Sequence, residues 1–516
     1  MKIPSLFHHN HKGKRQKSGN DDQQDYDLYI EDYNDYVRED YLVDRKKPGN
    51  GKQLMFVTYI FVAVFVAMMG YTVYYQAVKS PEVINSSYNK RQDIFSDKIV
   101  RGKILSNQKE VLAETQVASD GTETRYYPYE NIFAHVVGYS AKGKSGIESN
   151  ANFTLLRSNA PIFERVRNTL QGEKNMGDNV VTTLDLSLQK TAYNAMGSYR
   201  GAIIVMEPDT GKILAMVSKP DFNPNTMESS WDSLVADASG ESRLLNRVTH
   251  GVYPPGSTFK IITTLAYLRQ YNNVDSYQFN CTGSITKDNV TINCYHNSVH
   301  GNIDLRTSFA KSCNSSFANI GLILDKGEFA KTCDSLLFDQ KLSLPFSYKQ
   351  SSVSISEDSD TDEVMQTAIG QGKTQMTPLH MAMITSAIAN KGAVMKPYLI
   401  DSVENYEGTL IKEYSSKKSC TIMSEEEASI LKELMRAAVT EGTASKLSTS
   451  AYTAYGKTGS AEYNNEKGMS HSWFTGFAEA NGKNIVTTII VEGAGSGSEY
   501  AVPIAGKLFS EYFTNE

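Results

Sequence analysis

Several serines in this chain stand three residues before a lysine, and one of these pairs has a setting suited to acyl-transfer chemistry. On a helix, residues at this spacing share a face, so the lysine amine can take the serine hydroxyl proton. YPPGSTFKIITTLAYL places two prolines and Gly256 before Ser257 and an apolar helical pattern after it. Free N–H groups and the positive end of the helix dipole would stabilise an oxyanion there, and apolar neighbours would lower the pKa of Lys260. The other pairs lack this setting: Ser87/Lys90, Ser106/Lys109, Ser187/Lys190, Ser284/Lys287, Ser308/Lys311 and Ser415/Lys418.

Two further motifs carry groups of the same kind. Ser312-Cys313-Asn314 lies within SFAKSCNSSFANIG, and Lys457-Thr458-Gly459 precedes Ser460 and the apolar run HSWFTGF. Alone, a Ser-Cys-Asn tripeptide usually marks a helix cap or a loop. Together with Ser257 and Lys260, and in this order, the motifs match the Ser-x-x-Lys, Ser-x-Asn and Lys-Thr-Gly set of penicillin-recognising serine enzymes.

The sequence around the motifs extends this match to most of the chain. It resembles the class B penicillin-binding proteins, which are monofunctional peptidoglycan D,D-transpeptidases, and is most similar to their short, PbpA-like branch. The resemblance covers roughly residues 95 to 516. Arg101-Gly102 matches the family's Arg-Gly start, but the Asp-Arg-Asn-Gly that often follows is absent. The matching segments include GAIIVMEPDTGKILAMVSKPDFNPN, HGNIDLRTSFAKSCNSSF, AIGQGKTQMTPLHMAMITSAIANKG and YGKTGSAEYNNEKGMSHSWFTGFAE.

The resemblance implies a role for each motif residue in cutting the bond between the two terminal D-alanines of a stem peptide. Ser257 is then the nucleophile, and Lys260, neutral at rest, is its base. Ser312 relays the proton to the departing D-alanine, and Asn314 binds the substrate amide and orients Lys260. The backbone N–H groups of Ser257 and Ser460 form the oxyanion hole.

On the strand side, the resemblance gives Lys457 the positive charge that meets the substrate carboxylate. The hydroxyls of Thr458 and Ser460 hydrogen-bond that carboxylate, and Gly459 lets the substrate approach the strand closely. The amine of a neighbouring stem then accepts the acyl group and completes a cell-wall cross-link, while β-lactams mimic D-alanyl-D-alanine and acylate Ser257. The resemblance implies no cofactor and no metal ion.

These residues need a frame, and the apolar patterns predict one. Two apolar runs flank the turn at residues 208–211, and WFTGFAEANGKNIVTTIIVEG repeats this hairpin pattern around Asn481-Gly482. Helical patterns such as TPLHMAMITSAIANKG lie between the hairpins, and residues 500–513 fit an amphipathic helix. We therefore expect an α+β domain with one antiparallel sheet whose first and last strands pair, as in the transpeptidase and serine β-lactamase fold. His471 and Trp473 border the Lys-Thr-Gly strand and fit packing and substrate contact equally well.

The composition is that of a folded protein with one membrane span. Of 516 residues, 40% are apolar and 21% charged, and the net charge is −6. This balance excludes a disordered chain and gives no basic field for nucleic acid. The 22 residues of LMFVTYIFVAVFVAMMGYTVYY (54–75) are uncharged, and at about 1.5 Å per residue they cover a hydrocarbon core of about 30 Å. Basic residues are concentrated before this run. This predicts a single-pass protein of the cell membrane with a cytoplasmic N-terminus and an extracytoplasmic catalytic domain.

The patterns divide the chain into four predicted parts. These are a disordered cytoplasmic tail (1–53), a transmembrane helix (54–76), a small membrane-proximal module (77–180) and a transpeptidase domain (181–516). The module contains the strand-like runs IVRGKIL and FAHVVGY and no strong helical pattern. It is too short for a glycosyltransferase domain, which argues against a bifunctional class A enzyme. The resemblance instead implies pairing, through span and module, with a polytopic SEDS-type glycosyltransferase.

Two other functions could use the same residues. In a D,D-carboxypeptidase or β-lactamase on this fold, water would replace the acceptor amine, but a secreted β-lactamase does not usually carry an uncleaved anchor and such a module. A β-lactam sensor, or a scaffold that regulates a partner glycosyltransferase, is the second alternative. The complete motif set argues against an inactive scaffold, and the tail is no signalling domain.

Cys281, Cys294, His296 and His300 lie close together in the sequence, but their spacing is not a recognised zinc pattern. A Cys281–Cys294 disulfide, a pair of free thiols and a metal site all remain open, and the disulfide suits an oxidising compartment. Cys313 is expected to be a small buried residue rather than a second nucleophile.

Overall fold

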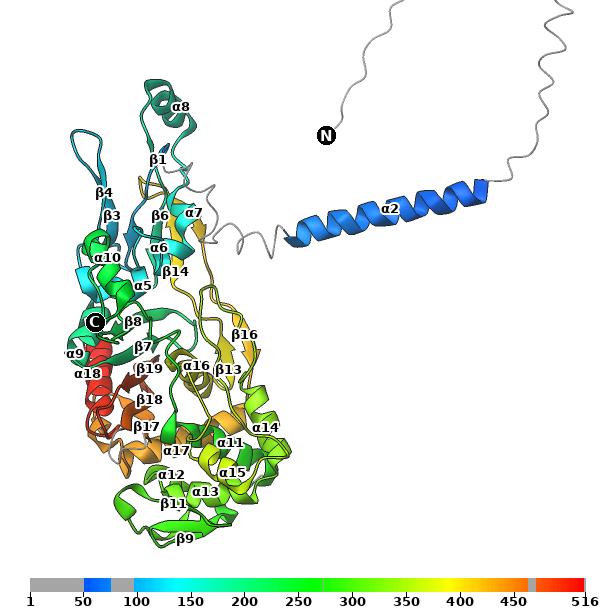
Figure 1. Ribbon diagram of the computed structural model, residues 1–516, viewed down its shortest axis with the longest axis vertical. Coiled ribbons are helices and arrows are strands. Elements are labelled where there is room, and N and C mark those ends of the chain that lie inside the picture. Colours follow the sequence, from blue (N-terminus) through cyan, green and yellow to red (C-terminus); the bar gives the residue numbers. More distant parts are fainter. Residues whose placement is uncertain (1–50, 76–96, 272, 463–469, 515–516) are drawn as a thin grey trace, which may run out of the picture. The chain divides into compact units, whose positions relative to one another are not determined.

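The computed structural model describes residues 51–75, 97–271, 273–462 and 470–514. The chain divides into two units, Met1–Lys79 and Ser80–Glu516 (Figure 1). In the first unit, helix α2 (Gly51–Tyr74) is long and apolar enough to cross a membrane, with a mean hydropathy of 2.2 over its most apolar stretch. The predicted span lies almost entirely within this helix. The predicted disordered tail lies almost wholly outside the described residues.

A five-stranded antiparallel sheet organises the second unit. Its strand order is β17-β18-β19-β7-β8, so the last strand of the domain, β19, pairs with the first, β7, as predicted. Both predicted hairpins are present, as β7–β8 and β18–β19. The edge strand β17 carries the Lys-Thr-Gly motif. The bounds are β7 (Gly201–Met206), β8 (Ile213–Lys219), β17 (Thr453–Glu462), β18 (Ser470–Ala480) and β19 (Lys483–Val491).

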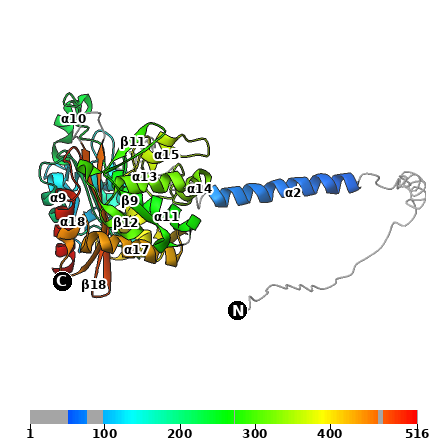
Figure 2. The same cartoon turned by 90° about the horizontal axis from the view of Figure 1, so that it is seen from below.

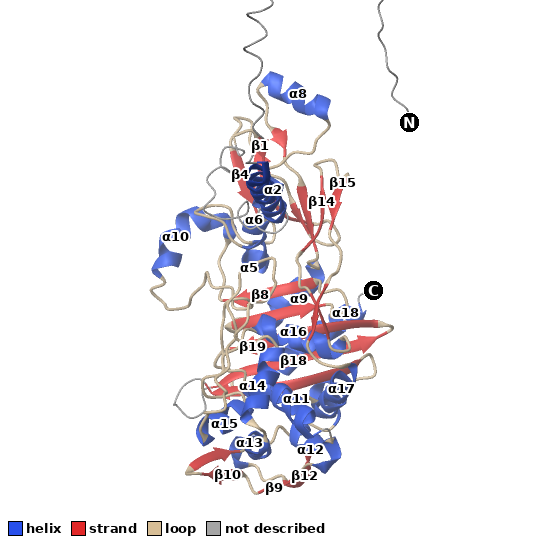
Figure 3. Ribbon diagram, turned by 90° about the vertical axis from the view of Figure 1, so that its right-hand side faces the viewer, coloured by secondary structure: helices blue, strands red, loops and turns tan. Residues whose placement is uncertain are grey.

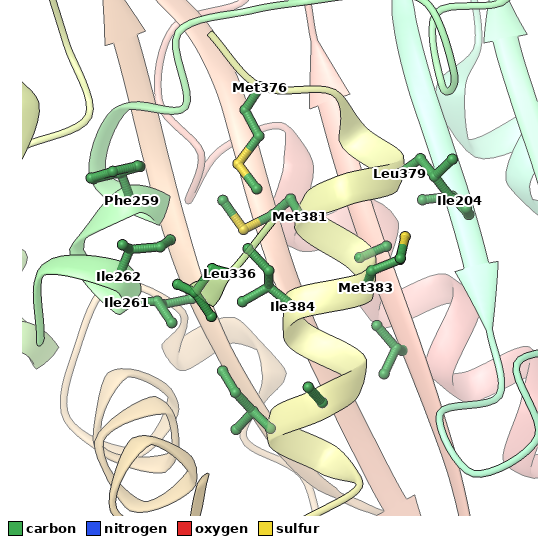
Figure 4. Close-up of a cluster of buried hydrophobic side chains, with 14 of the residues drawn as sticks. Ile204, Phe259, Ile261, Ile262, Leu336, Met376, Leu379, Met381, Met383 and Ile384 are labelled. Atoms are coloured by element: carbon green, nitrogen blue, oxygen red, sulfur yellow. The ribbon is translucent and has the colours of Figure 1, made fainter. Parts of the chain in front are cut away.

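The strands of this sheet are apolar at consecutive positions. Successive side chains point to opposite faces, so both faces of the sheet are apolar and buried. Ile203 and Val205 belong to one apolar core with α9 (Leu186–Met196) and α18 (Ala501–Thr514). Ile204 and Met206, which point to the other face, pack in a second core with α16 (Pro378–Ala389), and Figure 4 shows Leu379 of α16 beside Ile204. In Figure 2, α9 and α18 lie on one side of β18 and α11 (Lys260–Tyr271) on the other.

A lobe of helices and short strands packs beyond α16 and carries two of the three motifs. Helix α11 begins at the lysine of the first motif, and the second motif lies between α12 and α13. Helix α17 packs on β17, and Figure 3 shows the lobe at the far end of the unit from α8. The bounds are β9 (Gln278–Cys281), β10 (Ser284–Lys287), β11 (Val290–Asn293), β12 (Gly301–Asp304), α12 (Leu305–Ala310), α13 (Asn314–Ile323), α14 (Lys326–Ser335), α15 (Thr361–Ala368) and α17 (Glu425–Thr440). Helix α10 (Met227–Ala236) lies outside this lobe, where its Met227 packs with Ala134 and Phe222.

The part of the second unit that contains its N-terminal residues is built on a second sheet of six strands, in the order β15-β14-β6-β2-β3-β4. Two of its strands come from late in the chain, and β6 crosses position 180, so a division of the chain at that residue passes through a strand. The remaining elements are short. The bounds are β1 (Ile99–Val100), β2 (Ile104–Leu105), β3 (Val111–Val117), β4 (Glu123–Tyr126), α5 (Ala134–Val137), α6 (Gly146–Asn150), α7 (Asn152–Leu155), α8 (Ile162–Gln171), β5 (Asn175–Met176), β6 (Asn179–Thr182), β13 (Ala393–Met395), β14 (Ile400–Glu404), β15 (Leu410–Glu413) and β16 (Lys418–Thr421).

Two local predictions for this part were wrong. FAHVVGY forms the short helix α5 rather than a strand, and it ends at Gly138, whose φ of 86° breaks the helix. A short apolar run has no periodicity that separates a buried strand from a buried helical turn, and here all four residues of α5 are buried. The ten-residue helix α8 was also not foreseen.

The Arg101-Gly102 pair has a clear structural role in this part. Arg101 is buried and forms an ion pair with Glu148, which also binds Arg125. A Cβ at Gly102 would lie 1.9 Å from the Asp178 carbonyl oxygen, so only glycine fits there.

Candidate active site

The first motif forms a tight turn that is held against two neighbours. Gly256 has a φ of 54°, and its N–H donates to the Gly370 carbonyl at 2.8 Å. A Cβ at Gly256 would lie 3.0 Å from the Ser460 carbonyl oxygen on β17. Ser257 follows in a 3₁₀ turn (Gly256–Phe259) that leads into α11, so the prediction that it stands at a helix start is confirmed. The Ser257 side chain is half-buried, and its hydroxyl has no hydrogen-bond partner among the described residues.

Lys260 is fully buried and points to the second motif. Its Nζ lies 2.7 Å from Asn314 Oδ1, 2.8 Å from the Ser312 carbonyl oxygen and 3.3 Å from Ser312 Oγ. The Phe317 ring lies 5.3 Å from the ammonium. Burial lowers the pKa of Lys260 to about 7, so the amine is close to half-deprotonated at neutral pH. This agrees with the expectation that apolar neighbours tune this lysine.

The second motif lies where one helix ends and the next begins. Ser312 has a φ of 57°, which only a few per cent of non-glycine residues adopt. This conformation turns the chain, so that Cys313 caps α13 and Asn314 starts it. The Asn314 amide group donates to the Asn293 carbonyl at 3.0 Å, which leaves its oxygen for Lys260.

Lys457 completes the group from the sheet side. It is fully buried on β17, and its Nζ donates to Ser312 Oγ at 2.8 Å. Burial and the nearby Lys260 lower the pKa of Lys457 well below its ordinary value. The structure thus brings Lys260, Ser312, Asn314 and Lys457 into one hydrogen-bonded group, although they come from three segments far apart in the sequence.

Gly459 and Ser460 lie against the nucleophile turn, and Thr458 makes a contact elsewhere. Thr458 Oγ1 lies 2.6 Å from Thr443 Oγ1, and Ser460 is half-buried. A Cβ at Gly459 would lie 3.1 Å from the Pro255 carbonyl oxygen and 3.0 Å from the Trp473 Cβ. Glycine at this position therefore lets β17 pack closely on the turn that carries Ser257.

A buried polar network behind the turn escaped the sequence reasoning. Tyr253 OH donates to Glu492 at 2.7 Å, and Arg247 Nε donates to the same carboxyl oxygen at 2.7 Å. Trp473 is buried, and its Nε1 donates to the Pro254 carbonyl at 3.1 Å. The His471 ring lies 5.4 Å from that of Tyr253. The side chains of His471 and Trp473 thus pack beside Tyr253 and Pro254, just before the turn that carries Ser257. No local pattern marks this network, because Arg247 and Glu492 are far apart in the sequence.

Comparison with known proteins identifies the family. Residues 201–510 match the family model of the penicillin-binding protein transpeptidase domain, and residues 101–180 match that of the penicillin-binding protein A dimerisation domain. The peptidoglycan D,D-transpeptidase PbpA of Mycolicibacterium smegmatis is 30% identical over 434 residues, which cover 78% of this chain and 87% of that protein. The chain belongs to the class B penicillin-binding proteins. This confirms the resemblance read from the motifs.

Solved structures of this family share the fold. Penicillin-binding protein A from Mycobacterium tuberculosis, solved as a ceftriaxone acyl-enzyme complex, superposes with a TM-score of 0.74 at 27% identity. That similarity covers 81% of this chain and 99% of that chain. A D,D-transpeptidase domain from Eggerthella lenta gives a TM-score of 0.72 at 29% identity, covering 80% and 97% of the two chains. The predicted α+β transpeptidase fold is confirmed.

Proposed function

We propose that this class B penicillin-binding protein is a membrane-anchored peptidoglycan D,D-transpeptidase, which cross-links stem peptides through an acyl-enzyme on Ser257. The observation that carries the proposal is the convergence of two buried lysines on one serine hydroxyl: Lys260 Nζ at 3.3 Å and Lys457 Nζ at 2.8 Å from Ser312 Oγ. Such a group can move a proton without water. Membership of the family supports the substrate class.

In the acylation step, Ser257 Oγ attacks the carbonyl carbon between the two D-alanines. Neutral Lys260 takes the hydroxyl proton, and the backbone N–H groups of Ser257 and Ser460 stabilise the oxyanion. The carbon–nitrogen bond breaks as Ser312 passes a proton from Lys260 to the leaving D-alanine amine. Lys260 is then neutral again. The resting amine already donates to Ser312, so this relay needs no large movement.

The protonation states of Lys457 and Lys260 depend on each other, and substrate binding would favour one distribution of protons between them. Burial lowers the pKa of Lys457, and the repulsion between two ammonium groups beside one hydroxyl lowers it further. A substrate carboxylate placed next to Lys457, with Thr458 and Ser460 hydrogen-bonded to it, would favour the charged form of Lys457. That charge in turn favours a neutral Lys260, so that substrate binding prepares the base.

The second half-reaction separates the cross-linking function from its alternatives. The amine of a neighbouring stem attacks the acyl-enzyme and releases Ser257, whereas in a carboxypeptidase or β-lactamase water takes the place of the amine. β-Lactams would acylate Ser257 and remain bound if water is excluded. In this mechanism Asn314 binds the substrate amide, and Gly459 lets the substrate approach β17 closely.

We further propose the four-part division of the chain at residues 53, 76 and about 180, where the last boundary falls within β6, with α2 as the single membrane span. The excess of basic residues before the span supports a cytoplasmic N-terminus and an extracytoplasmic catalytic domain. The partner would be a polytopic SEDS-type glycosyltransferase that supplies the glycan strand. A sensor or scaffold function is disfavoured, because the buried lysine pair is assembled for proton transfer.

Fluorescent penicillin labelling of the full-length protein in detergent tests the proposal. Wild type should take a covalent label that survives denaturation, and Ser257→Ala should take none. Ser284→Ala is the matched control, because Ser284 also precedes a lysine by three residues but lies on β10, and it should label normally. Label that persists in Ser257→Ala would overturn the assignment. Release of the label within seconds would favour a β-lactamase, and release over hours a transpeptidase.

A further inference from the structure

Helix α8 presents its apolar side chains to solvent and its polar side chains to the protein. Ile162, Phe163, Val166 and Leu170 form an apolar stripe, and each is between 51% and 88% exposed. At about 100° of rotation per residue, the four side chains fall within an arc of about 100° around the helix axis. A surface helix normally turns such a stripe toward the core, so the orientation of α8 is the reverse of the usual one.

The polar face of α8 attaches the helix to the rest of the unit. Asn168 is buried, and its amide group donates to Asn175 Oδ1 at 3.2 Å. The Tyr406 hydroxyl donates to the Glu164 carboxylate at 2.7 Å. These contacts hold the helix from the side opposite the stripe, so the helix is fixed in place while its apolar side chains stay largely in contact with solvent.

Arginines border the stripe on both sides. Around the helix axis, Arg165 lies about 60° from Ile162, and Arg167 lies about 40° from Phe163 on the other side. Both arginines are exposed. An apolar face bordered by long basic side chains is typical of helices that lie in the surface of a bilayer, where the apolar face enters the acyl region and the basic groups reach the lipid phosphates.

The chain enters the second unit close to this helix. Ile99 of β1 lies opposite Asn175 of β5, the residue that Asn168 of α8 holds. Figure 1 and Figure 3 both show β1 near α8 at one end of the unit. Residues 75–98 connect α2 to β1, and a segment of this length spans at most about 85 Å. Along the chain, this end of the unit therefore has the shortest connection to the proposed membrane span.

A second copy of the chain fits the stripe less well than a lipid surface does. Four side chains supply a smaller area than the about 800 Å² on each partner that stable protein interfaces bury. In a symmetric pair, Arg165 and Arg167 of one copy would also meet the same arginines of the other, and like charges repel. The two positive charges instead complement an anionic surface.

We propose that α8 lies in the surface of an anionic phospholipid bilayer. The stripe enters the acyl region, and Arg165 and Arg167 bind the phosphate groups. This contact is a second attachment of the protein to the membrane, separate from α2, and it fixes one end of the folded unit at the bilayer. It goes beyond the proposed transpeptidase function and does not depend on it.

Fluorescence quenching in lipid nanodiscs that each hold one full-length chain tests this contact. Phe163→Trp adds a fluorophore to the stripe, and bromine on the acyl chains of phosphatidylglycerol should quench the added fluorescence by about half or more. Val299→Trp is the matched control, because Val299 is 68% exposed but precedes β12 in the lobe, and its added fluorescence should change little. Leu170→Trp is a second variant of the stripe and should behave like Phe163→Trp even if one of the two folds poorly.

Charge reversal tests the arginines. In the Phe163→Trp protein, the double change Arg165→Glu and Arg167→Glu should reduce the quenching at least about twofold, and so should phosphatidylcholine in place of phosphatidylglycerol. Lys341→Glu changes an exposed basic residue outside α8 and should leave the quenching as it was. Penicillin acylation should be the same in all of these proteins, because none of the changed residues belongs to the candidate active site.

Three results would overturn the lipid contact. The first is the absence of quenching in both stripe variants, which would leave the stripe for a protein partner that the discs lack. The second is equal quenching in Val299→Trp. The third is cross-linking of the stripe to a second copy, or to residues 76–96, in place of quenching by lipid. Normal quenching without acylation would refute the proposed function and leave the lipid contact standing.

Discussion

At the scale of single residues, the main feature of the site is a pair of fully buried lysines, Lys260 and Lys457. Each is surrounded by protein, with Phe317 near Lys260 and Phe309 near Lys457, at 5.3 and 5.5 Å from the two nitrogens. Burial disfavours the charged form of both, and shared access to Ser312 Oγ couples them. The rate of acylation therefore depends on which lysine carries a proton, and this rate should change with pH.

The first prediction concerns this proton. If Lys260 acts as the base, the rate of penicillin acylation should rise up to about tenfold per pH unit below its pKa and level off above it. The break should fall near the pKa of about 7 that burial gives the resting amine. Stopped-flow acylation across the neutral range measures it. A profile that is flat through neutral pH would contradict the role of Lys260.

The second prediction concerns Asn314, whose side chain holds Lys260 at 2.7 Å. Asn314→Ala should slow acylation about 100-fold, because the amine loses its orienting partner. The melting temperature should change little. Asn319→Ala on the same helix removes only a contact with Tyr277 OH at 3.3 Å and should acylate normally. Equal rates for the two variants would remove Asn314 from the mechanism.

At the scale of elements, the site depends on a turn, two helix starts and an edge strand. A polar network on the side of the turn away from Lys260 helps to hold them in place. Buried Arg247 forms an ion pair with half-buried Glu492. Glu492 also accepts a hydrogen bond from Tyr253, which lies just before the nucleophile turn. Burial alone would raise the pKa of Glu492, but Arg247 and the Tyr253 hydrogen bond hold it below its ordinary value. The network connects the end of β19 to the turn.

The third prediction follows from this network. Glu492→Gln should destabilise the protein by about 3–5 kcal/mol, because buried Arg247 loses the carboxylate that balances its charge and keeps only neutral hydrogen-bond partners. Since the pKa of Glu492 is depressed, the wild-type advantage is present at neutral pH and shrinks as the pH falls below the ordinary carboxyl range near 4. Thermal unfolding against pH measures both effects.

The matched control for this variant is an exposed ion pair. Glu441→Gln breaks the Arg306–Glu441 pair, whose side chains are 45% and 52% exposed. Water already solvates that pair, so its loss should cost at most about 1 kcal/mol. A similar cost for both variants would mean that the buried network does not stabilise the turn.

At the scale of the whole molecule, the chain joins an apolar helix to a folded unit with its own cores. The unit Ser80–Glu516 contains all of the motif residues and both large sheets. Its two large apolar cores lie on opposite faces of the five-stranded sheet. Nothing in the proposed acylation step draws on the helix α2.

The fourth prediction tests this independence. A soluble fragment beginning at Ser80 should acylate with penicillin at a rate within about twofold of the full-length protein, because a domain with its own core folds alone. The same labelling assay measures it, with Ser257→Ala in both forms as the control. A fragment that folds, as judged by circular dichroism, but does not acylate would show that the site needs the span or a membrane partner.

The sequence by itself determined the family, the long apolar helix and the frame of the catalytic domain. The motif residues Ser257, Lys260, Ser312, Asn314 and Lys457 could be named because each motif carries its chemistry within a few residues. The pairing of β7 with β19 could be predicted because hairpin patterns at both ends of a domain leave few alternatives. Local information was sufficient for these features.

Only the tertiary structure decided the contacts between distant segments. It placed Lys457 on Ser312 Oγ and Glu492 under the nucleophile turn. It also brought the sulfurs of Cys281, Cys294 and Cys313 and a ring nitrogen of His300 within 4.8 Å of one another, with the three cysteines unbonded, and left His296 out of this group. The physical reason is common to all of them: burial, charge coupling and ligand geometry depend on distances in space, and chain connectivity alone does not set these distances.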